Sequence, residues 1–481
     1  MTDMAEEYRA LPHSDLALPP SAERMDENDR SKPLTVIVTL RPAPGSQPDP
    51  DDDAPPSMAK LEDFMPLDAL VRQYGASSEG VREVEEFADR FGLKPGSFNV
   101  TVADKPEAIE TGGRIILLSG TVAAFETAFR TELFWGRNES GDRFLCRRGP
   151  LFVPQSLAKI VEGVFGLDER PLGEPALNTK TAGGVRDAPT PRQVAEYYEF
   201  PLPSSSPPQP SRIAIMEFGG GYRRADIDAY FTEAGLPPLP PIVDIGVLGA
   251  GNAPGSNVIY DQEVTLDIDV VGSVVEGAEI FVVFAPRTEA GWIAAIAAAV
   301  YDPRIRPAVI SISWGMAELQ SANGFDWTEG AMLTLSRLFR GAGFLGITVL
   351  ASAGDTGSWC KISDLRAHVL YPSSDPHVLS CGGTFIRNFG EPDSTEVTWT
   401  STGGGISAFF ALPRWQAALD MPMSVNDGAI NRGVPDVAGY AAPGCIFIYT
   451  PPAGVPEHFR AAGTSITAPL YAGLVALINQ E

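Results

Sequence analysis

Short runs of apolar and β-branched residues alternate with longer helical stretches through the second half of the chain. Runs of this length, separated by helices, indicate a parallel sheet that is covered on both faces. The expected fold class is therefore α/β, with ligands at the carboxyl ends of the strands. Strands are predicted at 213–218, 242–248, 280–284, 309–313, 347–351 and 378–381, and helices at 225–234, 262–275, 291–300 and 329–341.

The first half of the chain has a different pattern. Residues 34–40 alternate between apolar and polar side chains in the manner of a strand. Further strands and helices follow at lengths that fit one small α+β domain over 34–167. We predict strands near 98–102 and at 114–119, and helices at 78–91 and 121–131.

Segments rich in proline, glycine and charge divide the chain. Residues 1–33 mix polar residues with scattered proline, so we expect a disordered tail there, and the Pro/Asp run at 42–57 is typical of a loop. Residues 168–189 have the composition of an exposed linker that a protease could reach. The second domain is expected to span 190–481.

Composition restricts the classes of partner. The chain has 36 basic against 61 acidic residues, which disfavours nucleic acid or an anionic membrane as partner. The longest apolar stretch, 292–300, is too short to span a bilayer, and residues 1–30 show no recognisable signal peptide. The cysteines lack any CxxC pair, which favours free buried thiols over a zinc site or a disulfide framework. They are Cys146, Cys360, Cys381 and Cys445.

A candidate nucleophile lies in the sequence Ala-Gly-Thr-Ser-Ile-Thr-Ala-Pro at 462–469. An apolar run at 470–478 follows directly, so Ser465 would be held at a helix N-terminus with backbone donors around it. Serine and threonine before a helix are also ordinary N-caps, and proline is favoured in a first turn. The motif indicates catalysis only if other residues supply a base and an oxyanion donor.

Three carboxylates are candidates for those roles. Glu263 and Asp267 are four residues apart in a predicted helix, so both lie on one face, although ordinary helices also contain such pairs. Asp355 follows directly on the predicted strand 347–351, where a catalytic group would be placed. An aspartate that begins a turn is equally ordinary at such a position.

Histidine offers no persuasive base. None of the four histidines lies in a recognisable motif, so a Ser-His-Asp arrangement is not supported and a carboxylate must activate Ser465. A carboxylate with a pKa of about 4 stays partly ionised in acid, where imidazole is protonated. An aspartate that donates to an oxyanion must instead be neutral, which a partly buried site enforces at low pH. The histidines are His13, His368, His377 and His458.

Together these residues resemble the sedolisin family of serine-carboxyl peptidases, most closely its kumamolisin-like branch. The resemblance runs from about residue 34 to the end of the chain. It rests on ordered motifs: Ile-Ala-Ile-Met-Glu-Phe-Gly-Gly-Gly-Tyr at 213–222, the Glu263/Asp267 helix, Ser-Ile-Ser-Trp-Gly at 311–315, the Asp355 loop, Cys-Gly-Gly-Thr at 381–384, Ser-Thr-Gly-Gly-Gly at 401–405, Arg-Gly-Val-Pro-Asp-Val-Ala at 432–438 and the Ser465 motif.

The resemblance implies an acid-acting serine-type endopeptidase that is made as a zymogen. Its fold would be a subtilisin-like α/β domain, preceded by a small ferredoxin-like pro-domain that assists folding and blocks the cleft. The linker at 168–189 would be autoprocessed at low pH, between about Asn178 and Pro189. The substrates would be peptides, the protein a monomer and its location extracellular.

The same resemblance implies a role for each candidate residue. Ser465 would be the nucleophile, Glu263 the general base and acid, and Asp267 the group that orients Glu263. Asp355 would be the oxyanion-hole donor.

Further positions extend or depart from the family pattern. Glu217 and Trp314 match residues that continue the hydrogen-bond chain behind Asp267, although a strand-end glutamate and a core tryptophan are also ordinary. Leu370 stands in a substrate subsite where the best-known members carry an acidic residue, so no preference for basic residues is expected there. Family members bind calcium beyond the serine, but this chain ends sixteen positions after Ser465. No calcium ligands can be assigned, and the peptidase domain is expected to be C-terminally incomplete.

Two rival interpretations follow from single features. The Asp-Thr-Gly-Ser sequence at 355–358 resembles the active-site loop of aspartic peptidases, but those enzymes need two such aspartates in a β-rich fold. The short C-terminal region favours a pseudo-peptidase that is weak or inactive and only binds peptides.

Overall fold

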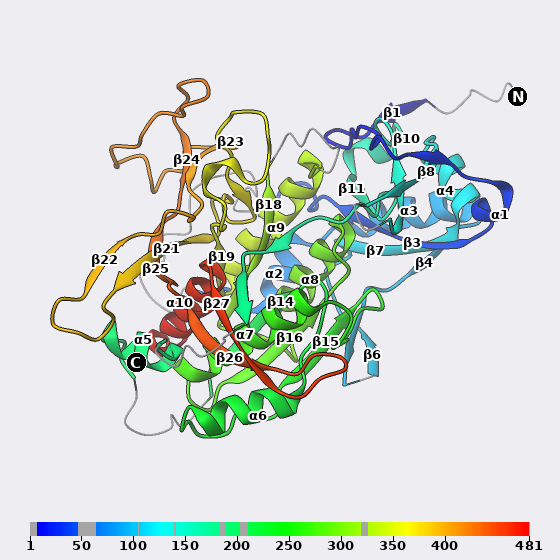
Figure 1. The fold of residues 1–481 in the computed structure, drawn as a ribbon. Coiled ribbons are helices and arrows are strands. Elements are labelled where there is room, and N and C mark those ends of the chain that lie inside the picture. The colour runs from blue at the N-terminus through cyan, green and yellow to red at the C-terminus, as the bar shows by residue number, and fades with distance from the viewer. Residues whose placement is uncertain are drawn as a thin grey trace, which may run out of the picture.

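The computed structural model describes residues 7–46, 64–103, 105–138, 141–181, 188–202, 210–318 and 326–480. These residues form a larger α/β unit and a smaller α+β unit that lie side by side (Figure 1). The smaller unit comes first in the chain, and the C-terminal helix lies inside the larger one.

A parallel sheet forms the centre of the larger unit. Its strand order is β21, β19, β17, β14, β16 and β15, and β25 also pairs parallel with β21. β22 joins antiparallel at the β21 edge. The bounds are β14 (Arg212–Glu217), β15 (Val243–Val247), β16 (Glu279–Phe284), β17 (Val309–Ile312), β19 (Thr348–Ser352), β21 (Leu379–Arg387), β22 (Thr395–Thr398) and β25 (Val437–Ala442).

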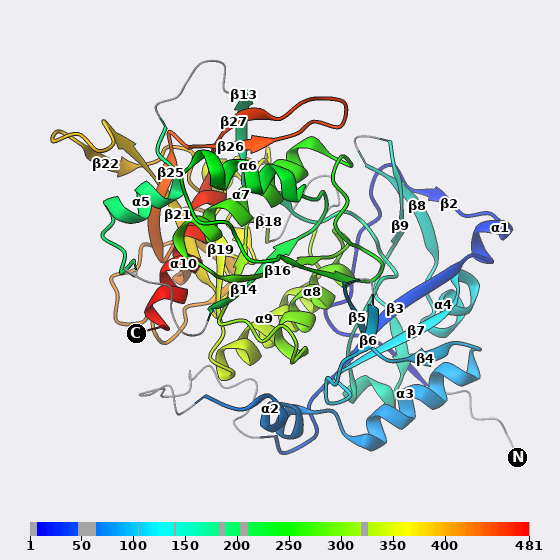
Figure 2. The same ribbon diagram turned by 90° about the horizontal axis from the view of Figure 1, so that it is seen from below.

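Helices cover both faces of this sheet because side chains alternate along each strand. On β14, Ile213 and Ile215 pack among α6, α7 and α10, whereas Ala214 and Met216 pack among α8 and α9. Figure 2 shows the two helical layers on opposite sides of the sheet. The predicted α/β class is confirmed. The helices are α5 (Pro191–Tyr197), α6 (Arg224–Glu233), α7 (Val258–Val274), α8 (Glu289–Tyr301), α9 (Glu329–Phe344) and α10 (Thr464–Ile478).

The smaller unit is built on an antiparallel sheet with the order β11, β3, β7 and β4. Two helices, α3 and α4, alternate with these strands along the chain, which gives the ferredoxin-like β-α-β-β-α-β order that we expect of the pro-domain. Val36 and Val38 of β3 pack against these helices, and Ile37 packs toward the larger unit. The elements are β3 (Pro33–Leu40), α3 (Ser78–Arg90), β4 (Lys94–Gly96), β7 (Ile115–Thr121), α4 (Val122–Ala128) and β11 (Val161–Phe165).

The expectation of a disordered tail at 1–33 is wrong for the described residues 7–33. Leu11 and Met25 are buried in the core of the smaller unit. A few apolar side chains spaced among polar ones anchor this segment, and so sparse a pattern has no period that identifies it in the sequence. Its elements and their partners are β1 (Tyr8–Ala10) with β10 (Phe152–Pro154), β2 (Glu23–Arg24) with β8 (Leu133–Arg137), and the helix α1 (Glu27–Arg30).

The two units share hydrogen bonds and ion pairs. β5 (Asn99–Val102) pairs antiparallel with β15, so the hairpin of β5 and β6 (Lys105–Ala108) extends the edge of the large sheet. Glu162 on β11 is ion-paired with Arg337 on α9 and with Arg114. The smaller unit is thereby docked on the larger one by main-chain pairing as well as by side chains.

The remaining elements are short. They are α2 (Leu67–Tyr74), β9 (Arg143–Arg147), β12 (Glu174–Pro175), β13 (Asn178–Thr181), β18 (Trp314–Ala317), β20 (Leu370–Tyr371), β23 (Gly405–Ala411), β24 (Asn431–Val434), β26 (Cys445–Tyr449) and β27 (Glu457–Ala462).

All four cysteines are free thiols, as predicted, and Cys360 is half-buried while the others are buried. Within the described ranges, no helix combines the length and the apolar character needed to cross a membrane. Most of the Pro/Asp run at 42–57 lies outside the described residues.

Candidate active site

Ser465 lies in the first turn of α10 and is fully buried. Gly463 holds the N-cap position and no side chain caps the helix, so Ser465 does not act as a cap. A Cβ at Gly463 would lie 2.3 Å from the carbonyl oxygen of Ala176 and 2.4 Å from Oδ2 of Asp355. Only glycine fits this close approach. The Ser465 Oγ donates to the carbonyl oxygen of Ser313 at 3.4 Å.

Glu263 and Asp267 lie one turn apart on α7, and both are fully buried. The Ser465 hydroxyl lies close enough to Glu263 to lower the pKa of that carboxyl, but no hydrogen bond of good geometry joins them. Burial raises the pKa of Glu263 most, and the charge of Asp267 raises it further. Burial also raises the pKa of Asp267, whose Oδ1 accepts from Ser313 Oγ at 2.8 Å.

Glu217 continues this group of carboxyls from the end of β14. Its Oε2 accepts from the indole Nε1 of Trp314 at 2.9 Å, and both residues are fully buried. Burial, followed by the charge of Asp267, raises the pKa of Glu217. Three neighbouring carboxyls in a buried site do not all ionise together, so Glu217, Asp267 and Glu263 titrate as one unit.

Asp355 follows β19 and faces the start of α10. Its Oδ1 accepts from the backbone N of Thr464 at 2.8 Å and from Thr464 Oγ1 at 2.9 Å. Its Oδ2 accepts from Nδ2 of Asn178 at 3.0 Å. Burial raises the pKa of Asp355 to about 7, although these donors lower it. The carboxyl is therefore neutral in acid and able to donate a hydrogen bond.

The linker between the two units runs through this site. β12 pairs antiparallel with β18, and β13 pairs antiparallel with β27 just before the nucleophile. Between them, the backbone N of Ala176 donates to the Ser313 carbonyl at 2.9 Å, and the Ala176 carbonyl accepts from the backbone N of Ser465 at 3.3 Å. The segment is thus held in extended form by main-chain pairing on both sides of Ala176.

The expectation that residues 168–189 are exposed is wrong for much of the described part. Leu172 and Ala176 are buried, and so are Asp168 and Arg170, whose carboxylate and guanidinium are 2.6 Å apart. Sheet pairing with distant strands buries this segment, and its composition does not reveal that pairing. Residues 182–187 lie outside the described residues.

Leu370 borders the strand that binds the linker. It lies on β20, which pairs antiparallel with β18. A Cβ at Gly354 would meet its Cδ1 at 2.5 Å, and one at Gly315 would meet it at 3.4 Å. An apolar side chain thus fills the space between the linker-binding strand and the Asp355 loop.

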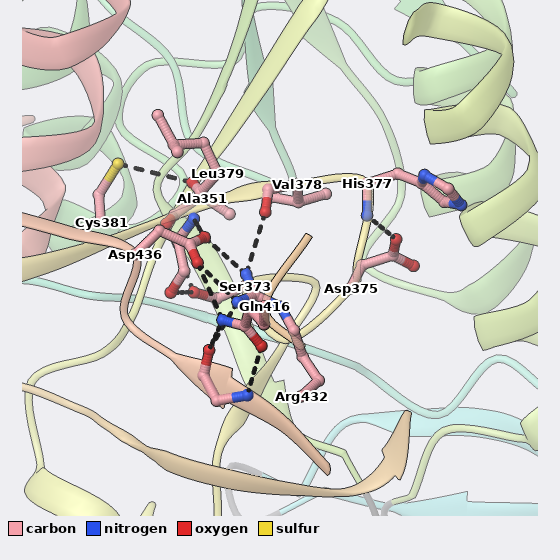
Figure 3. Close-up of polar contacts among 12 residues, drawn as sticks. Ala351, Ser373, Asp375, His377, Val378, Leu379, Cys381, Gln416, Arg432 and Asp436 are labelled. Atoms are coloured by element: carbon pink, nitrogen blue, oxygen red, sulfur yellow. Dashed lines mark hydrogen bonds and ion pairs between the residues drawn. The ribbon is translucent and has the colours of Figure 1, made fainter. Parts of the chain in front are cut away.

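The Arg-Gly-Val-Pro-Asp-Val-Ala motif forms a buried polar network around Arg432 and Asp436 (Figure 3). Arg432 is fully buried and binds Asp436 through both terminal nitrogens at 2.6 Å. Asp436 Oδ2 also accepts from the backbone N of Ser380 on β21 at 2.8 Å, and Gln416 donates to the carbonyl of Gly433 at 2.8 Å. The network fixes β24 and β25 against the large sheet.

Three of the histidines bind carboxylates elsewhere in the fold. The partner of His13 is Glu329, at 2.6 Å. His368 and His458 each lie 2.9 Å from their partners. These three side chains are thus each held by a carboxylate away from Ser465.

The sequence does not predict the contacts of Ser313, Thr464 and Ala176 at this site, nor that of Asn178 with Asp355. Ser313 and Thr464 lie within motifs already noted, so their neighbours were a signal. Ala176 and Asn178 had none, because their roles depend on pairing between segments far apart in the chain.

Calcium is the metal that the family resemblance leads us to expect. Among the described residues, no group of three or more His, Cys, Asp or Glu side chains could hold a metal ion.

Comparison with known proteins places the chain in a family. A family model described as the pro-kumamolisin activation domain matches residues 27–170. Kumamolisin from Bacillus sp. strain MN-32 is 36% identical over 471 residues, which cover 93% of this chain and 80% of that protein. Tripeptidyl-peptidase sed5 from Aspergillus fumigatus is 25% identical, covering 98% of this chain and 84% of that protein. A solved structure of Pseudomonas sedolisin, a serine-carboxyl proteinase, matches with a TM-score of 0.47 and 21% identity, covering 62% of this chain and 81% of that one. The chain is a serine-type endopeptidase with an N-terminal pro-domain and belongs to the sedolisin family of serine-carboxyl peptidases.

Proposed function

We propose that this peptidase is a zymogen that cleaves its own linker in acid and then hydrolyses other peptides through an acyl-enzyme on Ser465. The observation that carries the proposal is the position of Ala176, whose backbone N and carbonyl oxygen both bind the residues around the nucleophile. The proposed regions are the pro-domain at 34–167, the linker at 168–189 and the peptidase domain at 190–481. The mature protein is proposed to be an extracellular monomer.

The bond to be cleaved is the one between Ala176 and Leu177. The Ala176 carbonyl accepts from the Ser465 amide and is adjacent to the Asp355 carboxyl, since both would meet a Cβ at Gly463. These two donors are placed as an oxyanion hole requires. This geometry favours cleavage at a bond that lies just before the interval expected from the sequence, Asn178 to Pro189.

In the proposed reaction, Glu263 removes the proton from Ser465 Oγ as the oxygen attacks the carbonyl carbon of Ala176. The backbone N of Ser465 and protonated Asp355 stabilise the negative oxygen that forms. Glu263 then gives its proton to the departing amine of Leu177, which leaves Ala176 as an ester on Ser465. Water hydrolyses the ester by the same steps, with Glu263 again as the base.

The carboxyls behind Glu263 adjust its proton affinity. Asp267 and Glu217 are fully buried near it, and their shared burial raises the pKa of each group. Such a unit holds one or more protons in weak acid and can still release one to accept the serine proton. Ser313 and Trp314 hold Asp267 and Glu217 in position by hydrogen bonds of 2.8 and 2.9 Å.

Asp355 makes the proposed reaction depend on acid. It must be neutral to donate to the oxyanion, and its pKa of about 7 means that it gains its proton as the pH falls through neutrality. The intact zymogen is therefore expected to be stable at alkaline pH and to begin processing as the solution is acidified.

The test is to acidify the purified chain and to determine the new N-terminus by mass spectrometry, with peptide hydrolysis followed in parallel. Wild type should yield a fragment that begins at Leu177, while Ser465→Ala and Glu263→Gln should remain intact. Equal cleavage of all three proteins would overturn the carboxylate-base mechanism. If wild type neither processes nor hydrolyses peptides, the chain is a pseudo-peptidase.

A further inference from the structure

A second feature of the linker concerns the third residue before the proposed cleavage site. This residue is Glu174, which pairs in antiparallel register with Gly315 of β18. Its main chain is fixed, but about half of its side-chain surface remains exposed. The carboxylate turns toward Arg287 and Tyr260 rather than to solvent alone.

Arg287 lies in the loop between β16 and α8 and is held from several sides. Its carbonyl accepts from the backbone N of Leu172 at 2.8 Å. Its Nη1 donates to the carbonyl of Gly173 at 3.0 Å and to the hydroxyl of Tyr260 at 2.6 Å, and it is ion-paired with Glu174. With only 18% of its side chain exposed, the guanidinium is a fixed and partly desolvated charge.

Tyr260, in the first turn of α7, forms the other wall of this subsite. Its hydroxyl donates to Glu174 Oε2 at 3.2 Å. Its ring lies 5.3 Å from the Arg287 guanidinium carbon and packs edge to face on Trp314 at 5.0 Å. Because Trp314 itself is fixed by Glu217, the subsite is rigidly connected to the catalytic carboxyls.

Among the described residues, Glu174 is the only carboxylate in contact with Arg287. When the linker departs, the guanidinium and the Tyr260 hydroxyl lose this partner but keep each other. The Arg287 guanidinium and the Tyr260 hydroxyl then face the space left by Glu174. In a bound peptide, the side chain of the third residue before the cleaved bond would fill this space. An arginine in such a place binds carboxylate oxygens well and has no acceptor to offer a basic side chain.

We propose that Arg287 and Tyr260 form a specificity subsite that selects an acidic side chain three residues before the cleaved bond. The inference rests on the proposed function, because it takes the linker to be the first substrate. The contact of Arg287 with the Gly173 carbonyl serves every peptide alike, whereas the contact with Glu174 discriminates among them. The chain's own linker thus presents the side chain that the mature enzyme prefers.

The test uses the acid-processed enzyme and three peptides that differ only at this position. Each contains Xaa-Pro-Ala-Leu-Asn, with Xaa as Glu, Gln or Lys. We expect kcat/KM for Glu to exceed that for Gln by about three- to tenfold, with Lys slower still, because a charge-assisted hydrogen bond that is half exposed has this strength. Arg287→Ala should make the three rates nearly equal, and Arg306→Ala, at an exposed arginine, should leave the preference unchanged.

The pH dependence gives a readout that a purely structural role would not affect. A peptide glutamate is protonated below a pKa of about 4.3, so the preference for Glu over Gln should fade between pH 5.5 and 3.5. Arg287→Glu should reverse the preference toward Lys. In the intact chain, Glu174→Lys should slow processing, and combining it with Arg287→Glu should restore the rate.

Failure of this inference and failure of the proposed function are distinguishable. Equal rates for the three peptides, with normal processing at Ala176, would refute the subsite and leave the peptidase mechanism intact. No cleavage of any peptide, together with an unprocessed chain, would refute the proposed function and remove the basis for the subsite.

Discussion

Replacing Asp355 by asparagine should remove the alkaline limit of activity. With a pKa of about 7, the carboxyl carries its proton in about 99% of molecules at pH 5, in about half at pH 7 and in about a tenth at pH 8. If only the neutral form donates to the oxyanion, wild-type kcat/KM should fall about tenfold between pH 5 and pH 8. Asparagine donates at every pH in this range.

The structure indicates that asparagine can adopt the same position. Its Oδ1 would keep the two hydrogen bonds from Thr464, and its amide nitrogen would replace Oδ2, to which the Asn178 side chain would then present its oxygen instead of its nitrogen. Asp355→Ala is the matched control, because it removes the donor and should lower kcat by about 10²- to 10³-fold at pH 5. The two substitutions should therefore differ in magnitude and in the shape of their pH profiles.

The assay is peptide hydrolysis by the processed enzyme from pH 3 to pH 9, with folding checked by circular dichroism at each pH. We expect Asp355→Asn to retain activity at pH 8, where wild type has lost most of its own. An alkaline limb at the same midpoint in Asp355→Asn and wild type would refute the reasoning, since the titrating group would then lie elsewhere.

Three further substitutions test the electrostatics of the fold. Asn178→Ala removes a donor that lowers the pKa of Asp355, so the pH midpoint of self-processing should rise by a fraction of a pH unit, as measured by gel electrophoresis. Thr179→Ala changes a neighbour with the same backbone pairing and should leave the midpoint where it is. Asp269 is fully buried with neither oxygen hydrogen-bonded among the described residues, and burial raises its pKa well above the usual value. The stability that the neutral carboxyl gives is fully present below the unfolded pKa of about 4, and it is lost as the pH rises through the folded pKa. Asp269→Asn should therefore raise the free energy of unfolding by about 1–3 kcal/mol at pH 7 and by little at pH 4. Thermal denaturation at both pH values measures this, and an equal gain at both would contradict it. Arg432→Met leaves a buried carboxylate without its partner and should cost about 3–5 kcal/mol, with unchanged denaturant stability as the contrary result.

The peptidase domain was largely predictable because its strands are buried on both faces. A strand such as β14 must then be continuously apolar, and that pattern is visible in the sequence. The segment before residue 34 was not predictable, because isolated apolar residues such as Leu11 and Met25 have no period. Their burial follows from the shape of the pro-domain core.

The candidate site divides in the same way. The helical spacing of Glu263 and Asp267 predicts that they lie on one face. Because no histidine lies in a recognisable motif, these carboxylates are the expected base. Whether they act as base and orienting group stays a prediction. The sequence does not predict the contacts of Ala176, Asn178 and Arg287. These contacts depend on how the linker pairs with strands far away in the chain, and the whole fold determines that pairing.

The docking of β5 on β15 means that the pro-domain also covers an edge of the peptidase sheet. While the hairpin is in place, residues 245–247 on the outer side of β15 are paired with residues 100–102 of β5. Removal of the pro-domain uncovers this strand, and an uncovered edge can pair with strands of other molecules. Activation therefore also exposes an unpaired strand edge. Concentrated mature enzyme should self-associate through β15, and a strand-forming peptide that pairs with β15 in place of the hairpin should prevent this.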